Sequence, residues 1–217
     1  MAKRLSNEQS YATMNERIIE IATKLFADKG YQAVSTREIA DSLGINISTF
    51  HYHTGGKSNL YKSVIESLYQ GELHVLNRPV LNFKQEDYQN REKVSKTLLI
   101  ALEGFLDLML KDPHRSHLYV RRWLEWPDEL MDQEVKVTLK TFQPLKDFLE
   151  KSKLEGSIRN VDTSIFIRSF LWMTYGYFIT GIIDWKNWVS DPFKKKNMNA
   201  FKEYMREYTQ QMLFENV

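Results

Sequence analysis

The fold of this chain is decided by residues 35–57, which read STREIADSLGINISTFHYHTGGK. Ser35 and Glu38 have the spacing of a capping box, in which the hydroxyl and the carboxylate each satisfy a free N–H at the start of a helix. Ile39, Ala40 and Leu43 supply the apolar positions of that helix. Gly44 ends it, because glycine adopts the left-handed conformation that other residues resist. The pattern predicts a short helix followed by a sharp turn.

A second short helix follows the turn. Asn46 is placed to cap it, and the helix is expected over residues 47–53 until Gly55 and Gly56 break the chain. Two short helices joined by three or four residues are typical of a helix-turn-helix. The alternative interpretation is an ordinary helical hairpin with a polar face.

The flanking sequence completes a small helical domain. A capping box over residues 13–16 predicts a first helix that ends at Gly30. Lys57 or Ser58 opens a fourth helix, expected over 57–74, that connects this domain to the rest of the chain. We therefore predict a helix-turn-helix domain over residues 1–60.

The second short helix carries small or hydrogen-bonding side chains that suit a major groove. These are Ile47, Ser48, Thr49, His51, Tyr52 and His53. No Asp or Glu lies between Asp41 and Glu66, and a surface cleared of acids approaches phosphates without repulsion. The pattern favours double-stranded DNA as a partner.

Longer helices are predicted after a linker over residues 77–84, where Pro79 acts as a breaker. This second domain is expected to span 77–217. Its predicted helices cover 86–111, 113–126 (ended by Pro127), 128–155 with a kink or break at Pro144, 162–185, and a last one that starts at Asp191-Pro192. No segment reads clearly as a strand, so the predicted fold class is all-α.

Composition sets outer limits on function. The chain has 217 residues, of which 42% are hydrophobic and 27% charged, a globular composition rather than a disordered one. It has no cysteine, which excludes disulfides and thiolate metal sites. The formal charge of +2 gives no overall attraction to polyanions. No signal peptide is recognisable, and the apolar run from Ile165 to Ile183 is interrupted by Arg168, so a cytoplasmic location without a membrane span is expected.

At the helix-turn-helix the sequence resembles the TetR (tetracycline-repressor) family of transcriptional regulators, over about residues 13–65. The resemblance rests on Ile21-Ala22, Leu25-Phe26, Gly30-Tyr31, Thr36 to Ala40, Leu43-Gly44-Ile45, Thr49-Phe50-His51-Tyr52-His53, Lys57 and Leu60. It implies an all-helical homodimer with an N-terminal DNA-binding domain and a larger C-terminal domain that holds a ligand pocket and the dimer interface.

The resemblance also implies roles for single residues. Ile47, Ser48 and Thr49 match the positions that read bases, whereas Thr36, Tyr52 and Lys57 match positions that hold the phosphate backbone. Two residues depart from the family pattern. His51 stands at a phosphate-contacting position that usually holds tyrosine. Thr54 replaces a phenylalanine, so the packing between the second short helix and the fourth helix is expected to differ.

Two faces of the predicted helix 162–185 suggest two further sites. An aromatic face is expected to line a pocket together with residues of earlier helices, although plain core is the alternative; the pocket residues are Phe105, Met109, Trp123, Phe166, Phe170, Met173 and Tyr177. The other face has small residues that allow close helix approach, and we assign it with the last helix to the dimer interface. The interface residues are Ile165, Ser169, Trp172, Gly176, Ile179, Ile183, Phe201, Tyr204 and Tyr208.

Patterns for other chemistry are weak. Gly55-Gly56-Lys57-Ser58 imitates the end of a phosphate-binding loop, but that motif needs a glycine where His51 stands. His114 and His117 share a helical face, yet a third metal ligand is not evident. No arranged nucleophile is visible, so no catalytic residue, cofactor or metal is expected.

The sequence thus predicts a repressor that a small hydrophobic or aromatic ligand releases from its operator DNA. Two alternatives stay open. One is a DNA-binding regulator that answers to a protein partner or to no ligand, and the other is an all-helical enzyme.

Overall fold

The computed structural model describes residues 2–125, 131–186 and 188–215, with side chains described from Thr13 onward except at 131–134. The described chain packs as two compact units. The first contains the residues up to Leu68 and the segment from His117, and the second contains Tyr69–Ser116 and the residues from Gln133 onward. The division groups the segment from His117 with the helix-turn-helix, whereas the predicted domains follow the chain in order.

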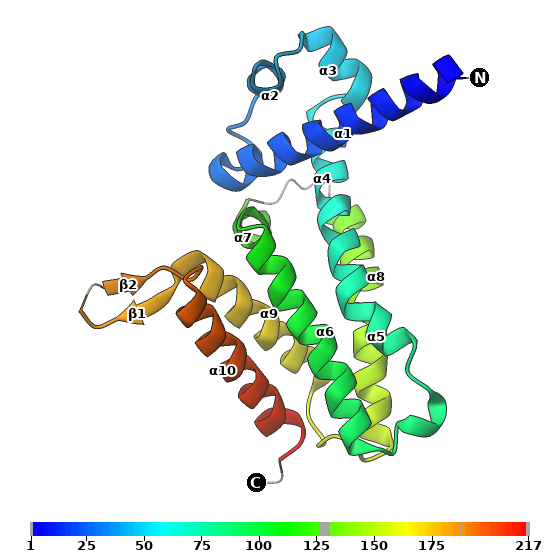
Figure 1. Cartoon of the computed structure of the whole chain (residues 1–217), viewed down its shortest axis with the longest axis vertical. Helices are drawn as coiled ribbons and strands as arrows, with labels where there is room; N and C mark the ends of the chain where they lie inside the picture. The colour runs from blue at the N-terminus through cyan, green and yellow to red at the C-terminus, as the bar shows by residue number, and fades with distance from the viewer. Residues whose placement is uncertain (1, 126–130, 187, 216–217) are drawn as a thin grey trace. The chain divides into compact units, whose positions relative to one another are not determined.

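The first unit is built on three N-terminal helices and the start of a fourth. These are α1 (Ala2–Lys29), α2 (Thr36–Leu43), α3 (Ile47–Thr54) and α4 (Lys57–Glu72). Helices α2 and α3 pack against α1 in a small bundle (Figure 1). Apolar side chains fill its core: Ile18, Ala22, Phe26, Val34, Ile39, Ala40, Phe50, Leu60, Tyr61 and Val64 are all buried. The Tyr61 ring packs edge-on to the Phe26 ring, with 5.1 Å between centroids.

Helix α1 begins well before the predicted capping box at residues 13–16. It starts at Ala2, so the predicted N-terminus is wrong. The stretch from Ala2 to Ala12 contains neither glycine nor proline, and nothing in it stops a helix. The box therefore lies inside a helix whose own N–H groups are already bonded.

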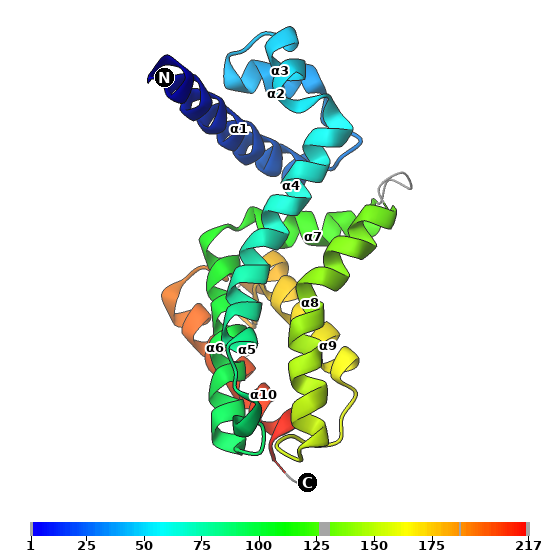
Figure 2. The ribbon, with the colours of Figure 1, turned by 90° about the vertical axis from the view of Figure 1, so that its right-hand side faces the viewer.

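The second unit is a bundle of longer helices. After α4, a π-helical turn (Leu73–Asn77) leads into α5 (Arg78–Leu81), and a 3-10 turn (Gln85–Asp87) precedes α6 (Arg91–Lys111). The others are α7 (His114–Leu124, shared with the first unit), α8 (Met131–Leu154), α9 (Thr163–Thr180) and α10 (Lys195–Leu213). Figure 2 shows α6, α8, α9 and α10 running side by side along the bundle. The all-α fold class is confirmed.

Several predicted boundaries in this unit change. The linker over 77–84 is wrong, because the chain stays helical to Leu81. Pro79 directly follows the π-helical turn Leu73–Asn77, and the chain passes this proline within a continuous helical run. Helix α8 continues through Pro144 without a break. Asn90 caps α6 by accepting from the Lys93 N–H at 3.1 Å. The predicted end of the 113–126 helix at Pro127 lies outside the described residues.

A β-hairpin replaces the predicted last turns of the 162–185 helix. Strands β1 (Ile182–Asp184) and β2 (Trp188–Ser190) pair antiparallel, with Ile183 opposite Val189. Gly181 ends α9 with a φ of 70°, and a Cβ there would lie 2.4 Å from the Ser190 carbonyl oxygen. Only glycine fits this close approach, so the helix ends there and a strand begins. The expectation that no segment forms a strand is corrected.

No helix within the described residues is long and apolar enough to cross a membrane.

Candidate nucleic-acid interface

The turn between α2 and α3 is fixed by side-chain caps and a left-handed glycine. The Ser35 hydroxyl accepts from the Glu38 N–H at 3.1 Å and starts α2. Gly44 has a φ of 68°, and its N–H bonds back to the end of α2. The Asn46 side chain then accepts from the Thr49 N–H at 2.8 Å and starts α3. The predicted helix-turn-helix is confirmed at the residues that predicted it.

The Glu38 carboxylate has two partners. The backbone N–H of Ser35 acts on it as the capping box requires, and it also pairs with the ammonium of Lys29. The hydrogen bond from Lys29 holds the pKa of Glu38 below its usual value. Glu38 therefore connects the end of α1 to α2.

Helix α3 has one buried anchor and one exposed face. Phe50 is fully buried and fixes the helix to the core of the unit. Ile47, Ser48, His51 and Tyr52 lie on the opposite side at helical spacing and are exposed, Tyr52 by 76%. Thr49 is half-buried beside this face. The structure therefore brings five predicted DNA contacts together on one short helix.

Two predicted phosphate contacts lie at the starts of neighbouring helices. Thr36 is the first residue of α2 and is half-buried. Lys57 is the first residue of α4, and its ammonium donates to the Gln32 carbonyl at 3.3 Å and lies 4.5 Å from the Tyr31 ring. Partial burial lowers the pKa of Lys57. Its two other N–H donors leave capacity for a further acceptor.

His53 and Thr54, the two residues before Gly55, have structural roles. His53 Nδ1 lies 2.9 Å from Asn15 Oδ1, so this ring faces α1 and not the exposed side of α3. The Thr54 hydroxyl donates to the Phe50 carbonyl at 2.9 Å and accepts from the Gly56 N–H at 3.1 Å. Thr54 thus joins the end of α3 to the start of α4 by hydrogen bonds, at the position where an apolar contact is expected to be lost.

Sequence reasoning missed Arg121, which closes the end of α1. Its Nε and Nη2 donate to the carbonyls of Ala27 and Asp28, each at 2.7 Å, and its Nη1 bonds Glu125 at 2.7 Å. The last carbonyls of a helix have no partner within the helix, and a cation suits that end. No local pattern signals this cap, because Arg121 follows Ala27 by 94 residues.

Comparison with known proteins agrees with this geometry. Residues 18–64 match the family model of bacterial regulatory proteins, tetR family. The chain is 32% identical over 76 residues to the probable HTH-type transcriptional regulator YttP of Bacillus subtilis, a match over 35% of this chain and 37% of YttP. It is 37% identical over 92 residues to the HTH-type transcriptional regulator SAB2452 of Staphylococcus aureus, over 42% of this chain and 46% of that protein. The helix-turn-helix domain of this chain belongs to the TetR family.

Other matches, by sequence and by structure, extend over most of the chain. The TetR-family transcriptional regulator PfmR from Thermus thermophilus superposes with a TM-score of 0.68 over 93% of this chain and 96% of its own, at 18% identity. The two curated relatives named above are matched over less than half of their own length. The relatives and the solved structure named here are all described as transcriptional regulators.

The predicted pocket residues of this chain are divided between its two units. Phe105, Met109, Phe166, Phe170 and Tyr177 are buried in the second unit, where the Phe105 and Phe170 rings lie 6.1 Å apart. Met173 is half-buried. Trp123 is 43% exposed and belongs to the first unit. The structure therefore brings most of these side chains into one core and places Trp123 outside it.

Tyr177 is held firmly in that core. Its ring stacks on Phe201 with 3.8 Å between centroids, and its hydroxyl donates to the Pro192 carbonyl at 2.7 Å. Burial, with the nearby charge of Asp191, raises the pKa of Tyr177 to about 12. Phe201 and Tyr208, two predicted interface residues, are half-buried against the aromatic face of α9. Phe201 stacks on Tyr177, and Tyr208 stacks on Phe166.

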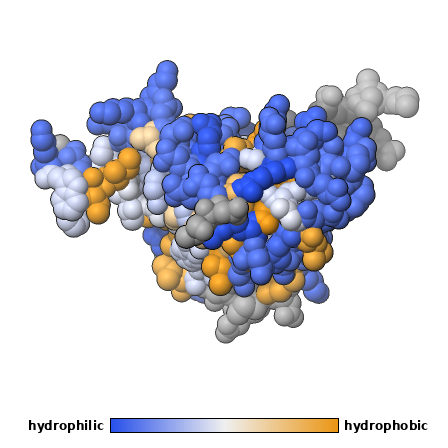
Figure 3. Space-filling view, turned by 90° about the horizontal axis from the view of Figure 1, so that it is seen from below, coloured by the Kyte–Doolittle hydropathy of each residue, from blue (hydrophilic) through white to orange (hydrophobic). Residues whose placement is uncertain are grey.

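The other predicted interface residues lie toward solvent. Trp172 is 40% exposed, Tyr204 on α10 is exposed, and Gly176 and Ile179 are half-buried. Ile165 and Ser169 follow the same face, one exposed and one half-buried. Ile183 is exposed but lies on β1 and not on α9. In Figure 3 orange and pale residues gather on this hairpin, which projects at the left of the view.

No group of three or more potential metal-ligating side chains is brought together within the described residues.

Proposed function

We propose that this chain is a sequence-specific DNA-binding transcriptional regulator. The observation that carries the proposal is the exposed face of α3, formed by Ile47, Ser48, His51 and Tyr52 on a helix anchored by Phe50. The segment between Asp41 and Glu66 has no carboxylate to repel phosphates. In this proposal α3 enters the major groove, with Ile47, Ser48 and Thr49 at the base edges.

Phosphates flank the groove on both sides of α3. Thr36 and Lys57 occupy helix N-termini, where N–H groups and the helix dipole favour an anion. Tyr52 and His51 extend from the exposed face toward the same backbone. These contacts position the protein, whereas the base contacts select the sequence.

The proposed active form is a homodimer. A two-fold dimer presents two recognition helices about 34–36 Å apart, which matches successive major grooves on one side of DNA. We assign the dimer contact to the exposed side of α9 and α10, with Trp172, Gly176, Ile179 and Tyr204. In this proposal, residues 1–60 form the DNA-binding domain, and residues 77–217 form the dimerisation and ligand-binding domain. Because its proposed partner is DNA, the protein would act in the cytoplasm.

The proposed mode is repression relieved by a small hydrophobic or aromatic ligand. A ligand that binds one arrangement of the C-terminal helices more tightly shifts the population toward that arrangement. The buried aromatic residues Phe105, Phe170 and Tyr177, with Met109 and Met173, supply the apolar surroundings in this proposal. Helix α4 runs from the first unit into the second and gives the change a continuous path.

DNA binding is tested by selecting bound sequences from a random duplex library with the purified chain. The affinity for the selected duplex is then measured at fixed salt for wild type and for Thr49→Ala/Tyr52→Ala. We expect specific affinity to fall at least about 100-fold, since each lost base or backbone contact costs about 1–3 kcal/mol. Ser63→Ala, on the exposed side of α4, is the control and should bind as wild type. Unchanged affinity of the double variant would refute the assignment of α3.

Ligand control has its own experiment. A thermal-shift screen with hydrophobic compounds is run with and without the selected duplex, because a ligand that binds only the folded state raises the melting temperature. A compound that stabilises the free chain and releases the duplex supports the proposal. If the duplex binds but no compound affects it, the chain answers to a protein partner or to no ligand at all.

A further inference from the structure

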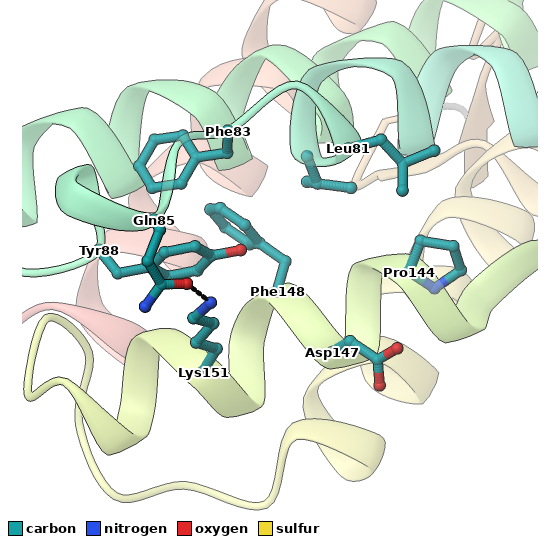
Figure 4. Close-up of a pocket in the computed structure, with 9 residues that line it drawn as sticks. Leu81, Phe83, Gln85, Tyr88, Pro144, Asp147, Phe148 and Lys151 are labelled. Atoms are coloured by element: carbon teal, nitrogen blue, oxygen red, sulfur yellow. Dashed lines mark hydrogen bonds between the residues drawn. The ribbon is translucent and has the colours of Figure 1, made fainter.

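A cavity of about 440 Å³ opens between the segment that follows α4 and the middle of α8 (Figure 4). It lies wholly within the second unit and shares no residue with the predicted pocket. Its volume is within the range of about 300–1,000 Å³ that small-molecule sites occupy. Nothing in the DNA-binding proposal uses it.

Three aromatic rings form one wall of the cavity. The Phe83 ring stands nearly perpendicular to both Tyr88 and Phe148, with centroid distances of 4.9 and 5.2 Å. The Tyr88 backbone is fixed from behind, since the buried Ser157 hydroxyl donates to its carbonyl. Leu81 and Pro144 continue the apolar lining beyond the rings in Figure 4. A preformed aromatic and aliphatic surface of this kind binds the apolar body of a ligand.

Hydrogen-bond donors converge at one end of this wall. The Lys151 ammonium lies 4.5 Å from the Tyr88 ring and donates to the Gln85 side-chain oxygen. Two of its N–H groups and the Gln85 amide NH₂ are left to donate to a ligand. The Tyr88 hydroxyl points into the cavity in Figure 4 and makes no hydrogen bond to another described residue. An ammonium, an amide and a phenol form a donor set for a carboxylate.

The acidic residue at the cavity, Asp147, lies away from the converging donors in Figure 4. Asp147 accepts from the Gln143 amide at 2.6 Å, and its carboxylate points away from the three rings in Figure 4. Burial, with the charge of Asp147, raises the pKa of Tyr88, and a tyrosine hydroxyl is a donor at neutral pH even without this shift. A cationic ligand would instead meet the charge of Lys151 at the aromatic wall.

We propose that this cavity binds a small carboxylate with an apolar body, its carboxylate on Lys151, Gln85 and the Tyr88 hydroxyl and its body against Phe148, Leu81 and Pro144. The site is independent of the DNA-binding proposal, because its occupancy is measured on the chain without DNA. Loss of DNA binding would leave this proposal intact, and the reverse also holds.

Calorimetric titration of the full chain tests the site. The probes are 3-phenylpropionate and octanoate, the neutral 3-phenylpropanamide and the cationic 3-phenylpropylamine. We expect at least one acid to bind at least tenfold more tightly than the amide and the amine. The ranking of the two acids identifies an aromatic or an alkyl body. No binding of either acid at millimolar concentration, or equal binding of the amine, would overturn the proposal.

Variants locate the binding on the cavity. Lys151→Met should abolish the preference for the acids over the amide, and Tyr88→Phe should weaken the acids at least threefold while keeping the ring. Lys146→Met, on the same helix but outside the cavity, is the matched charge control and should bind as wild type. Equal losses in Lys146→Met and Lys151→Met would show that only net charge matters and refute the site. If Lys151→Met does not fold by circular dichroism, Tyr88→Phe decides the question, and unchanged affinity there refutes it.

Discussion

At the scale of single residues, Lys57 is a cation that the protein already positions at the start of α4. Its ammonium is held by the Gln32 carbonyl and the face of Tyr31, which restricts the side chain before any DNA is present. An ordered side chain loses less conformational entropy when it binds. This arrangement suits a phosphate contact, which contributes affinity but no sequence information.

Replacing Lys57 by methionine should therefore weaken specific and non-specific DNA alike. One phosphate contact releases about 0.9 counterion, so the slope of log K against log salt should fall by about two in a dimer. The slope is measured by fluorescence anisotropy between about 50 and 200 mM salt. Lys140→Met, exposed on α8, keeps the same net charge as the variant and should retain the wild-type slope. An equal slope in wild type, Lys57→Met and Lys140→Met would show that Lys57 does not contact a phosphate.

Tyr177 gives a pH dependence of stability whose sign follows from its environment. Its pKa is about 12 in the folded chain, against about 10 when unfolded. The folded state thus keeps the proton more tightly, and the resulting stability is complete below pH 10 and lost as the pH rises through 12. Tyr177→Phe should cost about 1 kcal/mol at pH 7 through the lost hydrogen bond to Pro192.

The variant should also show a shallower decline of stability above pH 10 than wild type. Urea unfolding at pH 7, 10 and 11 measures both effects. Tyr52→Phe is the control, because Tyr52 is 76% exposed and lies outside the proposed dimer contact. A decline above pH 10 that is identical in Tyr177→Phe and wild type would exclude Tyr177 as the titrating group.

At the scale of elements, the end of α1 depends on a residue far along the chain. Arg121 donates to two terminal carbonyls, and Glu125 holds the guanidinium in place. Gly30 ends α1 with a φ of 82°, and a Cβ there would lie only 2.0 Å from a Glu125 carboxylate oxygen. Helix α1, Gly30 and the 121–125 segment therefore form one joint of the first unit.

Arg121→Ala should loosen this joint, since hydrogen bonds to a charged group contribute about 1.5–3 kcal/mol. The expected result is faster amide hydrogen exchange over residues 26–30, by at least about tenfold. Arg121→Lys keeps the charge but loses the planar set of donors. Its exchange rate over residues 26–30 should lie between those of wild type and Arg121→Ala. Arg78→Ala, at an exposed arginine on α5, should leave this exchange unchanged. Unaltered exchange in Arg121→Ala would mean that the cap does not stabilise α1.

Elements were predictable where their signals are local. Ser35, Gly44, Asn46 and Gly55 each act on residues within one helical turn, and α2 and α3 begin and end where those residues stand. The exposed face of α3 was predictable for the same reason, because the residues that form it are neighbours in the sequence. By contrast, Pro79 is not the breaker that its residue type predicts, because the chain passes it in a continuous run of π- and α-helix.

Elements that depend on distant contacts were not predictable from periodicity. The apolar run after Thr180 continues the helical pattern, and only the approach of Ser190 to Gly181 reveals the hairpin. The Arg121 cap and the cavity beside Lys151 join segments between about 60 and 95 residues apart, so no spacing in the sequence signals them. The aromatic face of α9 was identified as apolar, but periodicity does not separate a pocket from a core.

At the scale of the whole molecule, the second unit leaves an apolar surface on the side of α9, α10 and the hairpin that its own core does not cover. Trp172 and Tyr204 are 40% and 55% exposed, and Trp185 and Trp188 on the hairpin are 94% and 80% exposed. Large apolar side chains gathered on one surface usually mark a protein contact. A second copy of the same surface satisfies it by two-fold symmetry, which is the proposed dimer.

Trp172→Glu is the sharpest test of this dimer. Tyr208 is less suitable, because its stack on Phe166 makes it part of the core of its own chain. Two-fold symmetry introduces two carboxylates into the contact, and burying an unpaired charge costs several kcal/mol. We expect the dimer dissociation constant to rise at least about 100-fold, or about 2.7 kcal/mol, in sedimentation equilibrium. Ile100→Glu, at a residue 53% exposed on α6, introduces the same charge elsewhere and should remain dimeric. If Trp172→Glu dimerises as tightly as Ile100→Glu, the dimer contact lies elsewhere on the chain. If the wild-type chain is a monomer, there is no dimer, and the fixed spacing of two recognition helices on DNA is lost with it.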